Sequence, residues 1–406
     1  MPDGVHHYDE AGNRARITSL RDKGVDVWGP ERVYIAPDVK LERIEAGARI
    51  RHATLEGSKL LIGAETEIGA SGHARVSDCQ IGRNVSLGAG TYEGATILDR
   101  SSIRGWAEIR PGTLIEEEVE AAHTVAFKNT VLTATCVTGS VLNYCDLFMS
   151  GGTSRSNHSE VGSGVVHFNF DPRGDKWGSL LGDARGALLL RAPVFVGGQV
   201  GLVAPVSVGF GAVLAAGSLV RRDVDEDCVH FEQAENQRIR GFDREVYTGL
   251  RRKLVATARL VGSLWALDAW YEQVRTPFAD SLRTACYVEA REQLAAQVAE
   301  RVKRLGKLIA KLPRSLHKTE GRSEFEMVRA EHRLLIEKQV EIMAAFENPG
   351  APPPPVGFVT AYEQARRSNE HVAAVQSLND AVAAQAEDWI GAIAAEPERR
   401  LGALLG

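Results

Sequence analysis

Two cationic side chains eighteen residues apart are the residues best suited to chemistry. Arg110 stands in the turn sequence Arg110-Pro111-Gly112, and Lys128 follows it after eighteen residues. A guanidinium binds a phosphate through two parallel hydrogen bonds, and an ammonium adds a point charge to the same group. The two side chains can share one phosphate only if the fold brings positions eighteen residues apart next to each other.

The surrounding sequence has a repeat that does this. Between Val33 and Val224, aliphatic residues recur every six positions, a period that fits neither a helix face nor strand alternation. It is the hexapeptide repeat of a parallel β-helix, in which three hexads close one coil of eighteen residues. The clearest runs are Ile97, Ile103, Ile109 and Ile115; Val119, Val125, Val131 and Val137; and Val196, Leu202, Val208, Leu214 and Val220. We therefore expect a β-solenoid of roughly ten coils, with Arg110 and Lys128 stacked at one corner.

Glycine often follows the aliphatic residue of a hexad, as at Gly63, Gly69, Gly82, Gly88, Gly162, Gly197 and Gly209. We attribute these glycines to corners whose φ angles a Cβ atom resists. Two segments, 150–159 and 171–191, break the rhythm. Insertions in repeat proteins gather on one face, so we expect these segments to form loops near the binding site.

Beyond the repeat, the chain is rich in Ala, Leu, Glu, Arg and Lys, with apolar residues at helical spacing. The sequence thus predicts a β-solenoid followed by an α-helical C-terminal region. The expected parts are a lead-in with a short helix over 1–32, the β-helix over 33–231, a helical domain over 232–347, a stiff proline-rich linker over 348–358 and C-terminal helices over 359–406.

Composition narrows the classes of function. The 406 residues carry a net charge of −5, which excludes the strongly basic surface of a nucleic-acid-binding protein. We expect neither a membrane span nor a secretion signal, because no long apolar run occurs and the first residues are polar. Five cysteines without paired or Cys-x-x-Cys spacing favour reduced thiols in a cytoplasmic protein, and no metal site is expected.

The residues around the two cations resemble a known enzyme family. Ile109-Arg110-Pro111-Gly112 followed by Phe127-Lys128 is similar to the acetyltransferase half of the bifunctional N-acetylglucosamine-1-phosphate uridyltransferase/glucosamine-1-phosphate acetyltransferase, a hexapeptide-repeat acyltransferase. The resemblance extends from Ile97 to Val224. It implies a left-handed parallel β-helix, a homotrimer with active sites between prisms, and an acyl-CoA or acyl-carrier donor. It also implies that Arg110 and Lys128 hold the sugar phosphate or nucleotide.

Further matches assign more of the site. Asn169-Phe170-Asp171 resembles the family's Asn-Tyr-Asp, which lies at the sugar and the thioester, so the resemblance implies substrate binding by Asn169 and Asp171. The segments 202–206, 215–217 and 222–224 resemble the last coils of the family, which line the acyl-CoA groove. Gly198 and Ala216, eighteen residues apart, would flank the thioester there.

The family's catalytic histidine is missing. Gly139-Ser140 stands where the family has Gly-His, and a serine without a partnered base cannot remove a proton as an imidazole can. His158 lies eighteen residues after Ser140, so we expect it to stack one coil above and to act as the general base, oriented by Glu160 or Asp146.

Three residues remain with open assignments. His167, two residues before Asn169, is the competing candidate for the base and otherwise a substrate-binding residue. Asn143 and Tyr144 either face the same groove or only turn a corner. Five further histidines show no metal-ligand spacing, and we expect them to be structural or exposed: His6, His7, His52, His73 and His123.

Two functions follow. The first is acyl transfer from acyl-CoA to an amino-sugar phosphate or a nucleotide sugar, which needs no metal because the thioester is already activated. The second is a non-catalytic nucleotide-sugar-binding or scaffold protein that kept the phosphate site and lost the base. Uridyltransferase activity is not expected, because the sequence has no Gly-Thr-Arg signature and no α/β domain before the repeat.

Overall fold

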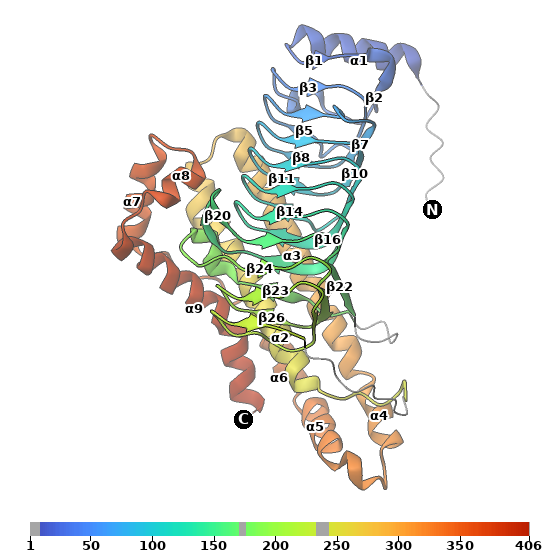
Figure 1. The fold of residues 1–406 in the computed structure, drawn as a ribbon, viewed down its shortest axis with the longest axis vertical. Coiled ribbons are helices and arrows are strands. Elements are labelled where there is room, and N and C mark those ends of the chain that lie inside the picture. Colours follow the sequence, from blue (N-terminus) through green and yellow to red (C-terminus); the bar gives the residue numbers. More distant parts are fainter. Residues whose placement is uncertain (1–8, 170–175, 233–242, 406) are drawn as a thin grey trace.

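Short parallel strands stacked into a long three-sided coil form the first part of the chain, and helices cover one of its sides (Figure 1). The computed structural model describes residues 9–169, 176–232 and 243–405. The helix α1 (Glu10–Asp22) covers the N-terminal end of the coil. The predicted fold class, a β-solenoid followed by a helical region, is confirmed.

Each coil contributes one strand to each of three faces. Face 1 is an 11-stranded sheet of β1 (Asp26–Val27), β3 (Arg49–Ile50), β6 (Glu67–Ile68), β9 (Ser86–Leu87), β12 (Ser102–Ile103), β15 (Glu120–Ala121), β17 (Val137–Thr138), β21 (Glu160–Val161), β24 (Phe195–Val196), β27 (Val213–Leu214) and β29 (Val229–His230). A second, 16-stranded sheet bends around a corner and supplies faces 2 and 3.

Face 2 consists of β2 (Val33–Ile35), β4 (Ala53–Glu56), β7 (Ala74–Ser77), β10 (Gly90–Glu93), β13 (Ala107–Ile109), the first halves of β16 (Val125–Leu132) and β18 (Leu142–Met149), β22 (Val166–Asn169), β25 (Gly201–Ala204) and β28 (Leu219–Val220). Face 3 consists of β5 (Leu61–Ile62), β8 (Gln80–Ile81), β11 (Thr96–Ile97), β14 (Leu114–Ile115), the second halves of β16 and β18, β23 (Ser179–Leu181) and β26 (Ser207–Val208). We name the corners 1–2, 2–3 and 3–1 after the faces that they join.

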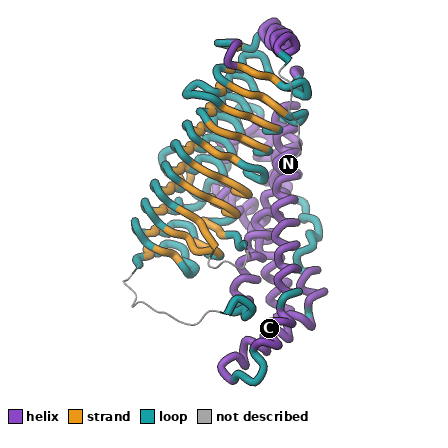
Figure 2. Tube along the Cα trace, turned by 90° about the vertical axis from the view of Figure 1, so that its right-hand side faces the viewer, coloured by secondary structure: helices purple, strands orange, loops and turns teal. Residues whose placement is uncertain are grey.

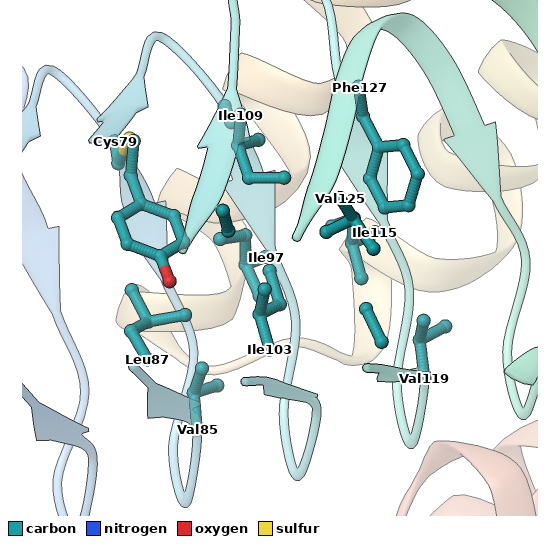
Figure 3. Close-up of a cluster of buried hydrophobic side chains, with 14 of the residues drawn as sticks. Cys79, Val85, Leu87, Ile97, Ile103, Ile109, Ile115, Val119, Val125 and Phe127 are labelled. Atoms are coloured by element: carbon teal, nitrogen blue, oxygen red, sulfur yellow. The ribbon is translucent and has the colours of Figure 1, made fainter. Parts of the chain in front are cut away.

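Aliphatic side chains from all three faces fill the interior of the coil. Figure 3 shows Ile97, Ile103, Ile109 and Ile115 stacked inside it, as the six-residue spacing predicts. The run from Val119 to Val137 is wrong at Val131, which lies on the outer side of face 3, and at Val137, which lies on the outer side of face 1. Leu132 and Thr138 point inward instead. The reason is a coil of seventeen residues, in which Phe127 pairs with Tyr144.

The glycines after the inward residues have a different cause from the predicted one. Of the seven named above, only Gly69 has a positive φ. A Cβ atom at Gly63 would lie 2.5 Å from the carbonyl oxygen of Gly82, and one at Gly162 would lie 2.5 Å from the nitrogen of Gly198. These glycines are therefore required by the close approach of successive corners.

The helical region packs along face 3 (Figure 2). Its members are α2 (Leu250–Ala269), the π-helical turn Trp270–Arg275, α3 (Ser281–Ile309), α4 (Leu312–Lys318), α5 (Glu326–Glu337), α6 (Gln339–Ala344), α7 (Val356–Arg366), α8 (His371–Gln376) and α9 (Asp380–Leu405). Outward apolar side chains of face 3, among them Leu114, Val131 and Phe148, form one buried cluster with these helices. No helix in the described ranges is long and apolar enough to cross a membrane.

The long helix α3 follows corner 2–3 and makes polar contacts with three of its coils. The side-chain amides of Gln293 and Gln297 donate to the carbonyl oxygens of Gly94 (3.2 Å) and Gly112 (2.8 Å). One turn later, Arg301 donates to the Asp146 carboxylate at 2.6 Å. The helical region is thereby fixed against the corner that carries Arg110 and Lys128.

A buried ionic cluster joins the helical region to corner 3–1. The guanidinium of Arg275, which is fully buried, lies between the carboxylates of Glu116 and Glu117. The Tyr271 hydroxyl donates to Glu116 at 2.6 Å, and Arg275 donates to the Tyr287 hydroxyl at 2.9 Å. We call these five residues the buried latch.

Candidate functional site

Arg110 and Lys128 lie at the same position of adjacent coils at corner 2–3. Ile109 pairs with Phe127, and the backbone N–H of Arg110 donates to the Phe127 carbonyl at 2.9 Å. Lys128 in turn pairs with Cys145 of the next coil. Arg110, Lys128 and Cys145 therefore form one row along the corner, which we call the clamp column.

The turn after Arg110 explains how this corner is built. Gly112 has a φ of +80°, and a Cβ atom there would lie 2.3 Å from the side-chain oxygen of Asn129. Only glycine fits this position without strain. In the next coil, the Asn129 amide donates to the Asp146 carboxylate at 3.0 Å. The corner is rigid because each coil bonds to the one above.

The clamp column has an excess of positive charge. The Arg110 side chain is 35% exposed, lies 3.7 Å from the Glu108 carboxylate and donates from Nη2 to the Cys145 sulfur at 3.6 Å. A thiol is a weak acceptor for a guanidinium. Lys128 is half-buried and forms no ion pair with any residue in the described part of the chain. This pair can therefore accept an anionic group such as a phosphate.

Asp146 has a structural partner instead of a histidine. Its side chain is buried, and its carboxylate accepts hydrogen bonds from Arg301 (2.6 Å) and Asn129 (3.0 Å). Burial holds the pKa of Arg301 below its ordinary value, although the Asp146 carboxylate raises it. Asp146 anchors α3 and does not orient a base.

The expected position of His158 is wrong. The residue stacked on Ser140 is Ser163, whose hydroxyl oxygen lies 3.0 Å from that of Ser140. This coil has twenty-three residues between paired positions, because it contains an antiparallel hairpin of β19 (Gly152–Ser154) and β20 (Asn157–His158). His158 lies in that hairpin at corner 3–1, where its Nδ1–H donates to the Arg155 carbonyl at 2.8 Å.

Glu160 does not accompany His158 either. It is exposed on face 1, paired with Val137 and Phe195 of the neighbouring strands. Corner 3–1 is separated from the clamp column by the whole of face 3, which the helices cover. The structure therefore does not bring His158, Glu160 and Asp146 together.

Two further candidates are interior residues. His167 is buried; its Nδ1–H donates to the Cys145 carbonyl at 2.6 Å, and its Nε2 accepts from the Ser179 hydroxyl at 2.7 Å. Burial lowers the pKa of His167 to about 4, so the ring is neutral and has both nitrogens engaged. Tyr144 is fully buried and stacks on Phe127 with 5.7 Å between ring centroids. Neither can contact a substrate on the surface.

Three predicted substrate-binding residues remain, and the structure describes two of them. Asn143 is exposed on the outer side of face 2, close to the clamp column. Asn169 ends β22, and its side-chain oxygen accepts from the Trp177 backbone N–H at 3.2 Å. Asp171 lies outside the described residues. Asn143 and Asn169 thus remain near the clamp column.

Corner 1–2 contains the residues expected at the thioester. The pairing of Val161 with Val196 and of Val196 with Leu214 places Ser163, Gly198 and Ala216 in one row along this corner. Ser140 precedes Ser163 in the same row. Gly198 is half-exposed and Ala216 is exposed, so the row leaves an open edge at the opposite end of face 2 from the clamp column.

A histidine that the sequence prediction set aside lies in the same row. Ala121 pairs with Thr138, which places His123 one coil before Ser140, and the Val141 N–H donates to the His123 carbonyl at 3.3 Å. The ring is exposed, with Nδ1 3.2 Å from the Thr124 hydroxyl. The sequence contained one indication of this position: His123 lies seventeen residues before Ser140, which is the length of one short coil. Within the described part of the chain, no group of three metal-ligating side chains could hold a metal ion.

Comparison with known proteins agrees with this architecture. No protein-family model matches the chain. "Bifunctional protein GlmU" of Trichlorobacter lovleyi is 33% identical over 234 residues, which cover 55% of this chain and 46% of the relative. The protein of the same name from Methylococcus capsulatus is 29% identical over 230 residues, covering 56% and 45%.

A third relative, "Bifunctional protein GlmU" of Acinetobacter baumannii, is 31% identical over 176 residues, or 39% of this chain and 35% of the relative. The chain thus spans less than half the length of these curated relatives. The repeat, the solenoid and the relatives agree with one another: the chain is a hexapeptide-repeat β-solenoid protein whose sequence is similar to proteins named GlmU.

Proposed function

We propose that the outer side of face 2 binds a phosphorylated amino sugar or a nucleotide sugar and that the protein transfers an acyl group to it. The observation that carries this proposal is the clamp column, in which Arg110 and Lys128 lie in adjacent coils and, over the described residues, share the single ion pair of Arg110 with Glu108. A guanidinium and an ammonium about 5 Å apart along the stack can bind one phosphate together. Asn143 and Asn169 lie close enough to bind sugar hydroxyls or an acyl-amino group.

We assign the general base to His123 instead of His158. An exposed imidazole at corner 1–2 faces the same end of face 2 as Ser140, the position at which the family has its histidine. Its Nδ1 is engaged with Thr124, which leaves Nε2 for the acceptor. The acceptor nitrogen or oxygen attacks the thioester carbonyl, Nε2 takes its proton, and the departing thiolate receives that proton. Nothing in this step requires a metal.

The acyl donor belongs at the open row of Gly198 and Ala216. A row without large side chains allows a thioester chain to lie against the backbone, and a Cβ atom at the adjacent Gly217 would meet nothing within 4 Å. Acyl-CoA is the donor that the family resemblance implies. The row lies on the same edge as His123, so donor and base are on one side of the acceptor.

Exposed apolar residues on this edge support a homotrimer. Trp106 is 76% exposed and Val141 is 56% exposed, two coils apart at corner 1–2, and Trp28 of the first coil is 63% exposed. Trp106 and Val141 also have positive φ angles, of 64° and 60°. Exposed polar residues such as Glu65 and Gln199 have the same conformation, so the ground for a contact is the exposed apolar surface. We therefore propose that this edge packs against neighbouring copies.

Thermal shift and thiol release test the proposal. We expect the melting temperature to rise with UDP-N-acetylglucosamine and with acetyl-CoA, because each ligand binds only the folded chain. Arg110→Met and Lys128→Met should abolish the first shift and leave the second. Thiol release should fall at least about 100-fold in His123→Asn, as expected for loss of a general base.

His158→Ala is the matched control, because its histidine lies at another corner. Full activity of His123→Asn together with an inactive His158→Ala would overturn the assignment of the base. Unchanged sugar-nucleotide binding in the Arg110 and Lys128 variants would overturn the clamp.

A second candidate function is favoured by Ser140. The hydroxyl of the serine at the family's histidine position lies 3.0 Å from that of Ser163 and, among the residues that the structure describes, bonds to no basic side chain; His123 lies one coil away. A protein with this site can bind a nucleotide sugar without turning it over. Stabilisation by UDP-N-acetylglucosamine, with no response to acetyl-CoA and no thiol release, would establish this function instead of the first.

A further inference from the structure

The end of α3 and the following α4 carry a run of basic residues that the proposed function does not use. From Arg301 to Lys318 the sequence has seven Lys or Arg residues and no Asp or Glu, in a chain whose net charge is −5. Successive helical residues turn by about 100°, so most of these side chains lie within one arc of about 100° on the helix. We call this set the basic stripe: Lys303, Arg304, Lys307, Lys311, Arg314 and Lys318.

The basic stripe lies on the solvent side of the helices. Arg301, Leu305, Leu308 and Leu312 are buried and form the opposite side. Lys303, Lys307, Arg314 and Lys318 are exposed. At 1.5 Å per residue, the stripe is about 22 Å long and one residue wide.

Helix stability does not explain the stripe. Lys303 and Lys307, like Arg314 and Lys318, are like-charged residues four positions apart, an arrangement that destabilises a helix. Elsewhere several exposed helical arginines pair with a carboxylate one turn away, as in Arg14–Glu10, Arg367–Glu363 and Arg399–Glu396.

Few carboxylates approach the stripe. Glu300 pairs with Arg304, and Glu245 pairs with Arg314 and Lys318. Lys311 lies over the Tyr247 ring. Over the ranges that the structure describes, Lys303 and Lys307 form no ion pair. The stripe therefore keeps a net positive charge on its own helix.

We propose that the basic stripe docks an acidic helix of a partner protein. Carboxylates four positions apart on a helix recur every 6 Å or so, the same interval as the cations of the stripe. The basic stripe is narrow and straight, so it matches the shape of a helix better than it matches a flat surface. Charge complementarity of this kind gives specificity and fast association.

Two other anionic partners fit less well. Amphipathic helices enter a bilayer through large exposed apolar side chains, and in the described chain none lies within the stripe itself; the nearest in sequence are Val288 and Met327. The net charge of −5 opposes association with nucleic acid. The stripe begins two residues after Arg301, which is bonded to Asp146 beside the clamp column, and it shares no residue with that column.

Fluorescence anisotropy with a designed peptide tests this proposal on the full chain. The probe is a stapled helix of about twenty residues with glutamates four positions apart on one face, and the comparison is an isomer with the same glutamates spread around the helix. We expect the probe to bind at least about tenfold more tightly than the isomer, and to weaken at least about tenfold between low and high salt.

Lys303→Glu combined with Lys307→Glu should abolish this binding, and Lys303→Gln combined with Lys307→Gln should weaken it. The matched control, Arg14→Glu with Arg367→Glu, makes the same change in net charge on other helices and should bind like the wild type. Circular dichroism verifies that each variant is folded. Equal binding of the probe and the isomer, or no binding of either, overturns the proposal. Tighter, Lys303-dependent binding to vesicles with anionic phospholipid or to duplex DNA also overturns it, in favour of that partner.

Discussion

Cys145, the third member of the clamp column, allows a direct test of what binds there. Cys79, Cys136 and Cys286 are buried, Cys145 is half-buried and Cys228 is exposed. Burial raises the pKa of Cys79 and of Cys136 to about 12, so these thiols do not react near neutral pH. We expect iodoacetamide to label Cys145 and Cys228 in the native protein, and UDP-N-acetylglucosamine to protect Cys145 alone.

Peptide mass spectrometry after timed labelling measures both sites at once, and Cys228 is the internal control. Equal labelling of Cys145 with and without the sugar nucleotide would show that the ligand does not cover the clamp column. Protection of Cys228 would point to a global change of the protein instead.

Because His167 is buried, we expect the free energy of unfolding to decrease in acid. Burial lowers its pKa to about 4, whereas a free histidine titrates near pH 6.5. Between these values the unfolded chain binds a proton that the folded chain excludes, so the free energy of unfolding falls as the pH decreases from about 6.5 to about 4. The full contribution of this buried ring is about 3 kcal/mol. Urea unfolding at several pH values measures it.

The variant His167→Gln isolates this contribution. Burial also lowers the pKa of His371, but His371 is present in both proteins and cancels in the difference. We expect the variant to lose less stability than the wild type between neutral pH and pH 4. An identical pH dependence of the two proteins would contradict the neutral, buried state of His167.

Among the elements, the buried latch determines how firmly the helical region is held. Arg275 is the cation between Glu116 and Glu117, and its removal leaves two buried carboxylates without the cation that they share. Breaking such a pair from one side costs about 3–5 kcal/mol. We therefore expect Arg275→Met to lower the free energy of unfolding by this amount in denaturant titrations.

Arg367→Met, which removes an exposed pair with Glu363, is the control and should cost at most about 1 kcal/mol. Glu117→Gln refines the test. Burial raises the pKa of Glu117, so its charged form opposes folding as the pH rises above the ordinary carboxyl pKa. The Gln variant should be less sensitive to pH in that range. If Arg275→Met had the free energy of unfolding of the wild type, the buried latch would not stabilise the packing of the helical region.

The six-residue spacing correctly predicted which residues point inward and which stack on one another wherever a coil has eighteen residues. The prediction failed where the length of the coil changes. Ile97 to Ile115 and Val196 to Val220 point inward as expected. Arg110 and Lys128 stack because the coil between them has eighteen residues. Counting failed for His158, because a hairpin lengthens its coil, and a count of residues cannot tell a hairpin from another turn of the solenoid.

The hexapeptide repeat also could not predict that helices cover face 3, because the repeat identifies only the residues that point into the coil. The outward residues Leu114, Val131 and Phe148 are apolar where a solvated face would be polar, and this was the available signal. Tyr144 was misassigned for a similar reason. In a seventeen-residue coil it falls on the inward side, next to Phe127.

For the whole molecule, the exposed apolar residues at corner 1–2 predict where the copies of the proposed trimer are in contact. Trp106 and Val141 project from one edge, far from the helices on face 3. We expect Trp106→Asp with Val141→Asp to convert a trimer into monomers, because charges replace the apolar contact between prisms. Light scattering coupled to size exclusion gives the mass.

Met327→Asp, at another exposed apolar residue, should leave the assembly unchanged. A double variant with the mass of the wild type would show that this edge is not the contact between copies. A wild-type protein that is itself monomeric would remove the trimer from the proposal while leaving the clamp column intact.

The contacts of α3 with corner 2–3 have a consequence for how the molecule comes apart. A stack of repeats in which each unit touches only its neighbours opens from its ends, one unit after another, like a zipper. Gln293, Gln297 and Arg301 fasten one rigid rod to the coils of Gly94, Gly112 and Asp146. Those coils must then open together or remain closed together. At the N-terminal end of the solenoid, fraying is confined to the coils before Lys59, which an ion pair ties to α3. The clamp column therefore lies in the cooperative block, where thermal opening of single coils cannot disperse its charges.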